Sequence, residues 1–147
     1  MKFKPIRIKR VFGVSKRTLF DAWSKPKTLS RWLFGGQWEE GCCTVENQFV
    51  VNGTYTIIMH FKNTGDSVIR GVYKTINRYT SLSFTWSNSG VKDSLVKLTF
   101  KSLSSNRTEL LLEHDLFPSA SMRDLHNEGW NRCLDNLEAE LEPPRAK

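Results

Sequence analysis

Hydrophobic and polar residues alternate with a period of two along most of the chain, and this pattern predicts a sheet of short strands. The first run places Ile6, Ile8, Arg10 and Phe12 on one face, with mainly polar residues on the other. Between residues 38 and 115 the alternation returns in about six runs, which are separated by turns rich in Gly, Asn and Ser. Runs joined in this way are typical of an antiparallel meander. The predicted strands span residues 3–12, 40–49, 54–61, 66–76, 82–86, 96–101 and 109–114.

Two short segments after the first strand show helical spacing instead. Ser15 is expected to cap a helix that ends at Trp23, and Pro26 opens a second helix over residues 28–33. A longer amphipathic segment follows the last strand. The order of one strand, two short helices, about six strands and one long helix predicts an α+β fold, with the helices on one face of a curved antiparallel sheet.

The long C-terminal helix is predicted to begin at Ser119 or Ser121, either of which can cap it, and to end near Leu141. At about 100° per residue its apolar side chains gather on one arc, and most acidic and amide side chains fall opposite. Leu125 extends one flank of this arc. We therefore expect the helix to lie on the sheet with the arc facing the core.

Three residues stand out in the middle of the apolar arc: His126, Gly129 and Cys133. A glycine inside a helix costs about 0.5–1 kcal/mol relative to alanine, and a buried histidine needs a hydrogen-bond partner. One interpretation is that Gly129 leaves room for a ligand and that His126 contacts it. The other is close packing of the helix on the sheet, with His126 a hydrogen-bonded core residue.

Short motifs along nearly the whole chain resemble those of one protein family. In order they are Ile8-x-Arg10, Leu29-x-x-Trp32, Asn52-Gly53-x-Tyr55, Gly71-x-Tyr73, Leu82-x-Phe84-Thr85-Trp86, Thr108-Glu109-Leu110 with His114, and His126-x-x-Gly129-Trp130-x-x-Cys133-Leu134-x-x-Leu137. Their order and spacing resemble the activators of heat-shock protein 90 ATPase, in particular the short bacterial branch of that family. This family lies within the START-like (SRPBCC) helix-grip superfamily.

The resemblance implies a helix-grip fold, in which the curved sheet wraps around the C-terminal helix and leaves a cavity between them. Cavities of this superfamily commonly hold lipids or other apolar molecules, and a minority of its members are enzymes. A single START-like domain over residues 1–142 with a short tail at 143–147 is expected. The residues that we expect to form the cavity are His114, Met122, His126, Gly129, Trp130, Cys133, Trp86, Phe84, Met59 and Trp32.

Two histidines are the candidate reactive or ligand-contacting groups of this cavity. His114 is predicted to point inward at the end of the last strand, where it can approach His126 on the following helix. Histidines titrate near neutral pH, so the pair could contact a ligand or act as general acid and base. A metal site would need further ligands, and Cys133 lies two turns beyond His126, too far for simple chelation. We therefore expect neither a metal nor a cofactor.

Composition narrows the class of protein further. A chain of 147 residues with 39% hydrophobic residues is long enough for one domain with its own core. The three cysteines, Cys42, Cys43 and Cys133, match neither a disulfide framework nor a Cys-x-x-Cys motif. No signal peptide, membrane span, nucleophile elbow or phosphate-binding glycine loop is evident. We expect a cytoplasmic protein that is a monomer or a weak homodimer.

The formal net charge of +7 is distributed unevenly along the chain. Residues 1–34 carry +9, residues 35–108 carry +3, and residues 109–147 carry −5. The basic residues are scattered over a strand and two helices, so we consider nucleic-acid binding unlikely. Arg10 lies on the inward face of its strand, either as an anchor for an anion or as half of an ion pair, and the ion pair is favoured. The basic front and the acidic tail are expected to neutralise each other in part.

Together these features predict a non-catalytic domain that binds a small apolar or aromatic molecule, such as a lipid. Two alternatives follow from the same features. One is a co-chaperone that stimulates heat-shock protein 90, as the family resemblance implies, and the other is a cyclase or hydrolase that uses the cavity histidines.

Overall fold

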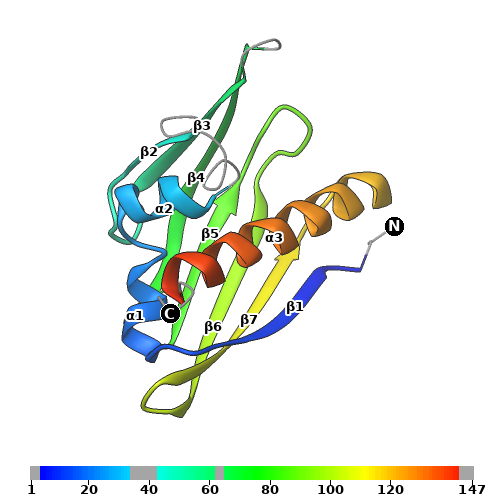
Figure 1. Cartoon of the computed structure of the whole chain (residues 1–147). Coiled ribbons are helices and arrows are strands. Elements are labelled where there is room, and N and C mark those ends of the chain that lie inside the picture. Colours follow the sequence, from blue (N-terminus) through cyan, green and yellow to red (C-terminus); the bar gives the residue numbers. More distant parts are fainter. Residues whose placement is uncertain (1–3, 34–42, 62–64, 143–147) are drawn as a thin grey trace.

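The computed structural model describes residues 4–33, 43–61 and 65–142, and the ten elements it contains follow the predicted order (Figure 1). Residues 40–42 of the strand predicted over 40–49, which include Cys42, and the expected tail at 143–147 lie outside the described residues. The elements are β1 (Ile6–Phe12), α1 (Lys16–Asp21), α2 (Pro26–Trp32), β2 (Cys43–Asn47), β3 (Thr54–Phe61), β4 (Gly65–Asn77), β5 (Ser81–Trp86), β6 (Ser94–Ser104), β7 (Arg107–Asp115) and α3 (Ala120–Leu141).

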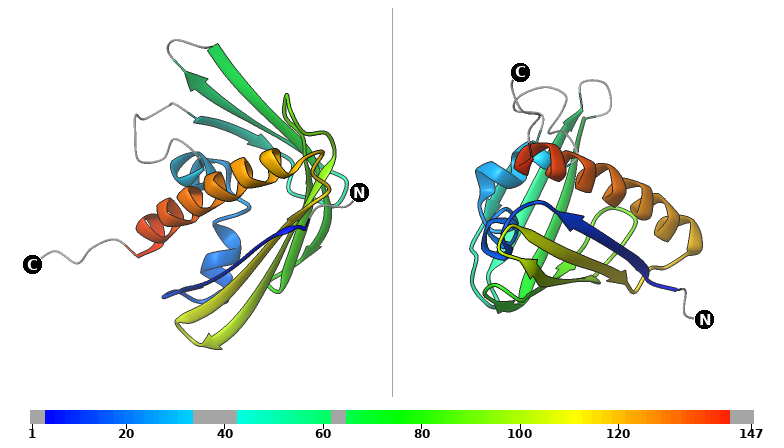
Figure 2. Two further views of the ribbon diagram at one scale, coloured as in Figure 1. Left: turned by 90° about the vertical axis from the view of Figure 1, so that its right-hand side faces the viewer. Right: turned by 60° about the horizontal axis from the view of Figure 1, so that its bottom comes forward.

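The seven strands form one antiparallel sheet in the order β1-β7-β6-β5-β4-β3-β2. The first strand lies beside the last, with Ile6 opposite His114 and Phe12 opposite Thr108. The sheet curves, and α3 lies against its inner face while α1 and α2 lie beside it (Figure 2). The predicted α+β fold with a helix on one face of a curved sheet is therefore confirmed. Because side chains alternate along each strand, one set of residues per strand faces α3.

The first short helix begins where the sequence predicts, but both short helices differ from their predicted bounds. The side-chain oxygen of Ser15 accepts a hydrogen bond from the backbone N–H of Thr18 at 3.2 Å, so Ser15 is the N-cap of α1. This helix ends at Asp21, two residues before the predicted end. Helix α2 begins at Pro26, two residues before the predicted start, because proline fits the first turn of a helix without losing a hydrogen bond.

The long helix α3 is capped by Ser119, whose side chain accepts a hydrogen bond from the N–H of Met122 at 3.2 Å. Ser121 therefore lies inside the first turn. The prediction that Leu125 extends the buried face is wrong, because its side chain is 60% exposed. The predicted apolar arc of α3 is wider than the face that a helix can bury against a single sheet. Leu125 lies at the edge of this arc and therefore points to solvent.

The connections differ from their predictions mainly around β2. The strand predicted over residues 40–49 ends at Asn47, two residues early, and the loop from β2 to β3 is longer than a two-residue hairpin. Asn52 adopts a left-handed conformation with φ of 70°, and a Cβ on Gly53 would lie 2.1 Å from the carbonyl oxygen of Gln48. The Asn52-Gly53 pair therefore still makes the tight turn that the sequence indicates.

The described helices include none that is both long and apolar enough to cross a membrane.

Candidate functional site

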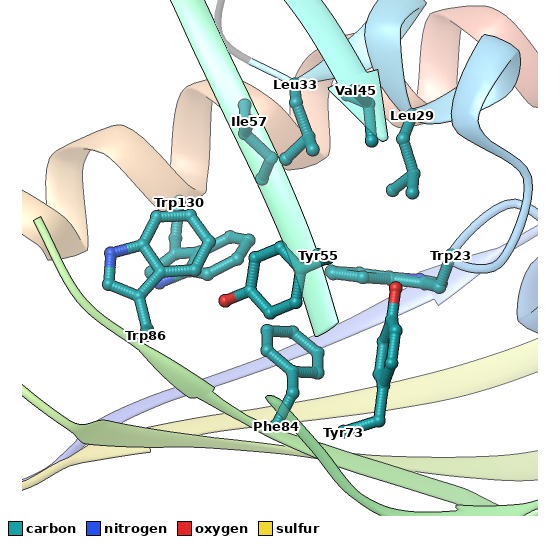
Figure 3. Close-up of a pocket in the computed structure, with 10 residues that line it drawn as sticks. All are labelled: Trp23, Leu29, Leu33, Val45, Tyr55, Ile57, Tyr73, Phe84, Trp86 and Trp130. Atoms are coloured by element: carbon teal, nitrogen blue, oxygen red, sulfur yellow. The ribbon is translucent and has the colours of Figure 1, made fainter. Parts of the chain in front are cut away.

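A pocket opens between the inner face of the sheet and helices α2 and α3 (Figure 3). It encloses about 360 Å³ of empty space, part of which is open to solvent. Strands β2 to β5, helices α2 and α3 and the turn between α1 and α2 contribute to its wall. The lining residues are Trp23, Leu29, Leu33, Val45, Tyr55, Ile57, Tyr73, Phe84, Trp86 and Trp130. None of them carries a formal charge.

Aromatic rings that contact each other form most of the pocket wall. The ring centroids of Trp86 and Trp130 lie 5.0 Å apart, and those of Tyr55 and Phe84 lie 5.6 Å apart. The ring centroid of Trp23 lies 6.0 Å from that of Trp130. Aromatic side chains have few rotatable bonds and stabilise one another in tilted or edge-to-face pairs, so this wall is rigid.

Gly71 allows Tyr55 to reach across the sheet. Tyr55 on β3 lies opposite Gly71 on β4, and the Tyr55 hydroxyl donates a hydrogen bond to the carbonyl oxygen of Thr85 on β5. A Cβ on Gly71 would lie 2.4 Å from the Tyr55 ring and 1.9 Å from that same carbonyl oxygen. Only glycine leaves space for the phenol ring at this crossing.

The two phenols of the pocket are uncharged at neutral pH. Burial raises the pKa of Tyr55 well above its ordinary value, and the nearby Tyr73 raises it further. Burial also raises the pKa of Tyr73, although a hydrogen bond from Asn47 opposes the shift. The pocket is therefore apolar and uncharged, with hydroxyl and indole groups as its polar atoms.

His114 lies behind the pocket wall, fully buried, and both of its ring nitrogens are engaged. The indole Nε1 of Trp130 donates to His114 Nδ1 at 3.0 Å, which places the imidazole hydrogen on Nε2. His114 Nε2 then donates to Ser94 Oγ at 2.8 Å, and that hydroxyl donates to the carbonyl oxygen of Trp86 at 2.6 Å. Burial lowers the pKa of His114 to about 3, with the nearby His126 adding to the effect. The imidazole is therefore a neutral link that holds Trp130 against β5.

His126 lies beside His114, as the sequence predicts, with ring centroids 5.7 Å apart. Its Nδ1 donates to the backbone carbonyl oxygen of Met122 at 2.8 Å, and its Nε2 accepts from the side chain of Asn88 at 3.0 Å. Both nitrogens of this half-buried ring are thus hydrogen-bonded, Nδ1 within α3 and Nε2 to the β5–β6 turn. Neither histidine lines the pocket.

The candidates named from the sequence fall into separate groups. Phe84, Trp86 and Trp130 line the pocket. Trp32 is buried behind the wall, 4.6 Å from Trp23 by ring centroids, and donates its indole N–H to the carbonyl oxygen of Ala22. The remaining candidates do not line the pocket: His114, His126, Met122, Gly129, Cys133 and Met59.

Gly129 leaves open space instead of permitting a close approach to the sheet. A Cβ built on this residue would have no atom of its surroundings within 4 Å. The interpretation of close packing at this position is therefore wrong. At about 100° per residue, Gly129 lies on the edge of α3 and not at the centre of its buried face.

Seven lining residues were not among the sequence candidates: Trp23, Leu29, Leu33, Val45, Tyr55, Ile57 and Tyr73. Period-two alternation places Tyr55 and Ile57 on the same face of β3 as Met59, and could have identified them. Tyr73 belongs to the Gly71-x-Tyr73 motif. The α2 residues carry no chemical signal in the sequence, because helix packing alone brings them to the pocket.

The described parts of the chain contain no group of three or more His, Cys, Asp or Glu side chains placed to hold a metal ion.

Residues 14–142 match the family model described as Activator of Hsp90 ATPase homolog 1-like protein. The chain belongs to this family. The resemblance found in the sequence motifs is therefore confirmed. A search of curated proteins finds no match.

Solved structures share the fold of this family member. Protein CV1439 from Chromobacterium violaceum aligns with a TM-score of 0.80 at 20% sequence identity, covering 97% of this chain and 100% of that one. PFC0360w, an HSP90 activator from Plasmodium falciparum, aligns with a TM-score of 0.76 at 23% identity, covering 98% and 100%. The AHSA1 protein SPO3351 from Silicibacter pomeroyi aligns with a TM-score of 0.73 at 23% identity, covering 93% and 96%. These similarities support the helix-grip fold over nearly the whole chain.

Proposed function

We propose that the chain binds a small, uncharged apolar molecule with an aromatic ring in the pocket between α2, α3 and the sheet. The observation that carries this proposal is the wall itself, in which all ten side chains are aliphatic or aromatic. Ligand sites of proteins are lined mainly by such residues. The aromatic rings of this wall suit a ligand that has an aromatic ring of its own.

The free energy of binding would come from removing apolar surface from water, at roughly 25 cal/mol per Å². The aromatic rings of the wall are held in place before binding, so little side-chain entropy is lost. Trp130 is oriented by His114, and Tyr55 by its hydrogen bond to Thr85. A flat ligand would therefore meet a preformed surface.

The same geometry disfavours a cyclase or hydrolase based on the two histidines. A general base needs a nitrogen that can reach the substrate proton. Both nitrogens of His114 and both of His126 already bind groups of the protein, and neither ring lines the pocket. These histidines support the structure of the wall.

Titration with indane, an uncharged bicyclic hydrocarbon, tests the proposal. We expect saturable binding of indane in ligand-detected NMR. Val45→Phe should weaken indane binding at least tenfold, because the larger ring fills the pocket from β2. The matched control is Val51→Phe in the exposed β2–β3 loop, which should bind as the wild type does. Absence of indane binding, or equal binding by Val45→Phe, would contradict the proposal.

A co-chaperone role is a second candidate, and family membership is the observation that favours it. An ATPase assay with a heat-shock protein 90 and increasing amounts of this chain tests it directly. We expect no stimulation, because the features that define the site belong to an internal apolar pocket. A concentration-dependent rise in ATP hydrolysis would establish the co-chaperone role instead.

A further inference from the structure

The indole N–H of Trp23 is buried and lacks an acceptor. Trp23 is 3% exposed, and its Nε1 has no hydrogen-bond partner among the residues that the structure describes. By contrast, Trp32 donates to the carbonyl oxygen of Ala22, and Trp130 donates to His114. Buried donors without an acceptor are rare in folded proteins, and each calls for an explanation. Trp23 differs from Trp32 in lining the pocket, so a ligand can supply the missing acceptor.

A second hydrogen-bond donor lies close to this indole. Asn47 Nδ2 donates both to the backbone carbonyl oxygen of Ser24, at 2.9 Å, and to the hydroxyl of Tyr73, at 3.1 Å. The Tyr73 hydroxyl therefore lies near the backbone that directly follows Trp23, and Figure 3 shows it directed toward the Trp23 ring. The hydroxyl accepts the bond from Asn47, and its own hydrogen has no acceptor among the described residues. Burial raises the pKa of Tyr73, so this hydrogen is retained at neutral pH.

The other polar groups of the wall offer no acceptor to these two donors. The hydroxyl of Tyr55 is directed to the carbonyl oxygen of Thr85, and the remaining lining side chains have no acceptor atom that competes for a donor. One side of the pocket thus presents two hydrogen-bond donors within an apolar, uncharged surface. A carbonyl oxygen has two lone pairs and can accept from both donors.

We propose that the pocket selects aromatic molecules that carry a carbonyl oxygen, and that Trp23 and Tyr73 are the residues that determine this specificity. The inference rests on the proposed function, since it names the ligand class of the same pocket. A carboxylate is excluded from this class, because no lining residue is positively charged and a buried unpaired charge is strongly unfavourable. An aryl ketone or a quinone fits the donors and the walls together.

The test compares 1-indanone with indane, which share the same ring system and differ by one carbonyl group. In the wild-type protein, 1-indanone should shift one indole N–H signal downfield, as expected for a new hydrogen bond, and indane should not. Trp23→Phe keeps an aromatic ring but lacks the donor, so it should remove this signal. The same variant should weaken 1-indanone binding about tenfold, the size of one good hydrogen bond. Indane binding should fall less than 1-indanone binding, so the ratio of the two dissociation constants measures the contribution of the donor.

Tyr73→Phe should weaken 1-indanone selectively in the same way, and Tyr79→Phe is its matched control. Tyr79 packs on Phe20 and Arg17 outside the pocket wall, so its variant should keep the wild-type ratio of the two dissociation constants. Near-UV circular dichroism and thermal unfolding establish that each variant is folded.

The outcomes separate this inference from the proposed function. If neither probe binds to the wild-type protein, both proposals fail. If both probes bind and Trp23→Phe weakens them equally, the pocket binds apolar molecules but the donor specificity is wrong. If 1-indanone binds the wild-type protein without a downfield shift of the Trp23 signal, the donor role is also wrong, whether or not the variants fold.

Discussion

At the scale of single residues, the polar groups of the core form one continuous path behind the pocket. The path runs from the indole of Trp130 through His114 and Ser94 to the backbone of Trp86. Each of these groups donates one hydrogen bond to the next. A single neutral tautomer of His114, protonated on Nε2, is therefore compatible with all three hydrogen bonds. Two of the pocket tryptophans are thereby fixed relative to each other. The ionisation of His114 should therefore affect the stability of the wall.

Stability should fall as the pH is lowered from 7 to 5. The folded protein keeps His114 neutral, because burial lowers its pKa to about 3, while the same residue in the unfolded chain titrates near 6.5. Between these values the unfolded chain binds more protons, so the free energy of unfolding decreases with falling pH. The expected loss between pH 7 and pH 5 is about 2 kcal/mol, measured by urea unfolding.

His114→Gln removes the titrating group and should flatten this dependence, whatever its effect on stability at pH 7. His60→Gln is the control, because it removes an exposed histidine of β3 that contacts Thr44 and Asp66 and not His114 or its partners. An unchanged slope in His114→Gln would show that another group is responsible.

The sequence identified the residues of the site only in part, and the reason is physical. Strand alternation is a local property, so it placed Phe84 and Trp86 on the inner face and His114 near the end of β7. Trp23 and Leu33 lie in irregular segments at the ends of short helices, where no periodicity fixes the direction of a side chain. The hydrogen-bond partners of His114 come from β6 and α3, and such long-range pairs have no signature in a single sequence.

At the scale of elements, two glycines illustrate how the neighbouring element determines whether a side chain would fit at a position. Gly71 on β4 lies under the ring that Tyr55 extends toward β5. Gly129 lies on α3, with open space where its side chain would be. In the sequence the two positions look alike, since each is a glycine inside a predicted strand or helix. They differ only in how the adjacent element packs against them.

Alanine substitutions at these two positions should have opposite effects on stability. Gly71→Ala should lower the free energy of unfolding by about 1–3 kcal/mol, because its Cβ would meet the Thr85 carbonyl oxygen at 1.9 Å. Gly129→Ala should raise it by about 0.5–1 kcal/mol, the difference in helix propensity. Urea unfolding of both variants measures the change. A destabilised Gly129→Ala protein would contradict the open space at this position.

The elements themselves were well predicted where the pattern was long and regular. Strands β5, β6 and β7 alternate over most of their length, and each lies in the sheet with one face buried. The bounds of strand β2 were harder to predict, since β2 has five residues and lies at the edge of the sheet. Asn47 at its end is held by Ser24 and Tyr73, which are distant in sequence. Tertiary contacts of this kind define β2 more than its own pattern does.

At the scale of the whole molecule, the uneven charge of the chain is partly balanced inside the fold. Because β1 lies beside β7, the basic front of the sequence and the acidic final helix are close in space. Arg10 on β1 pairs with Asp135 on α3 at 2.7 Å, and Arg31 on α2 pairs with Glu140. The sequence-based preference for an ion pair at Arg10 is confirmed. These pairs join α3 to both of the elements that flank it.

Removing both acidic partners should loosen α3 in a salt-dependent way. Asp135→Asn combined with Glu140→Gln should lower the free energy of unfolding by about 1 kcal/mol at low ionic strength, since each partly exposed pair contributes about 0.2–1 kcal/mol. The difference from wild type should shrink in 1 M NaCl, where charges interact over only about 3 Å.

The matched control for this double variant is Glu128→Gln with Glu138→Gln. These two residues are also exposed on α3, but neither makes an ion pair within the described residues. Both double variants raise the net charge equally, so a general effect of charge would destabilise them alike at low salt. A larger, salt-sensitive loss in the Asp135/Glu140 variant alone is expected, because only that variant breaks contacts between α3 and its neighbours. Equal losses would instead show that the distribution of charge acts through the overall field of the protein and not through these two pairs.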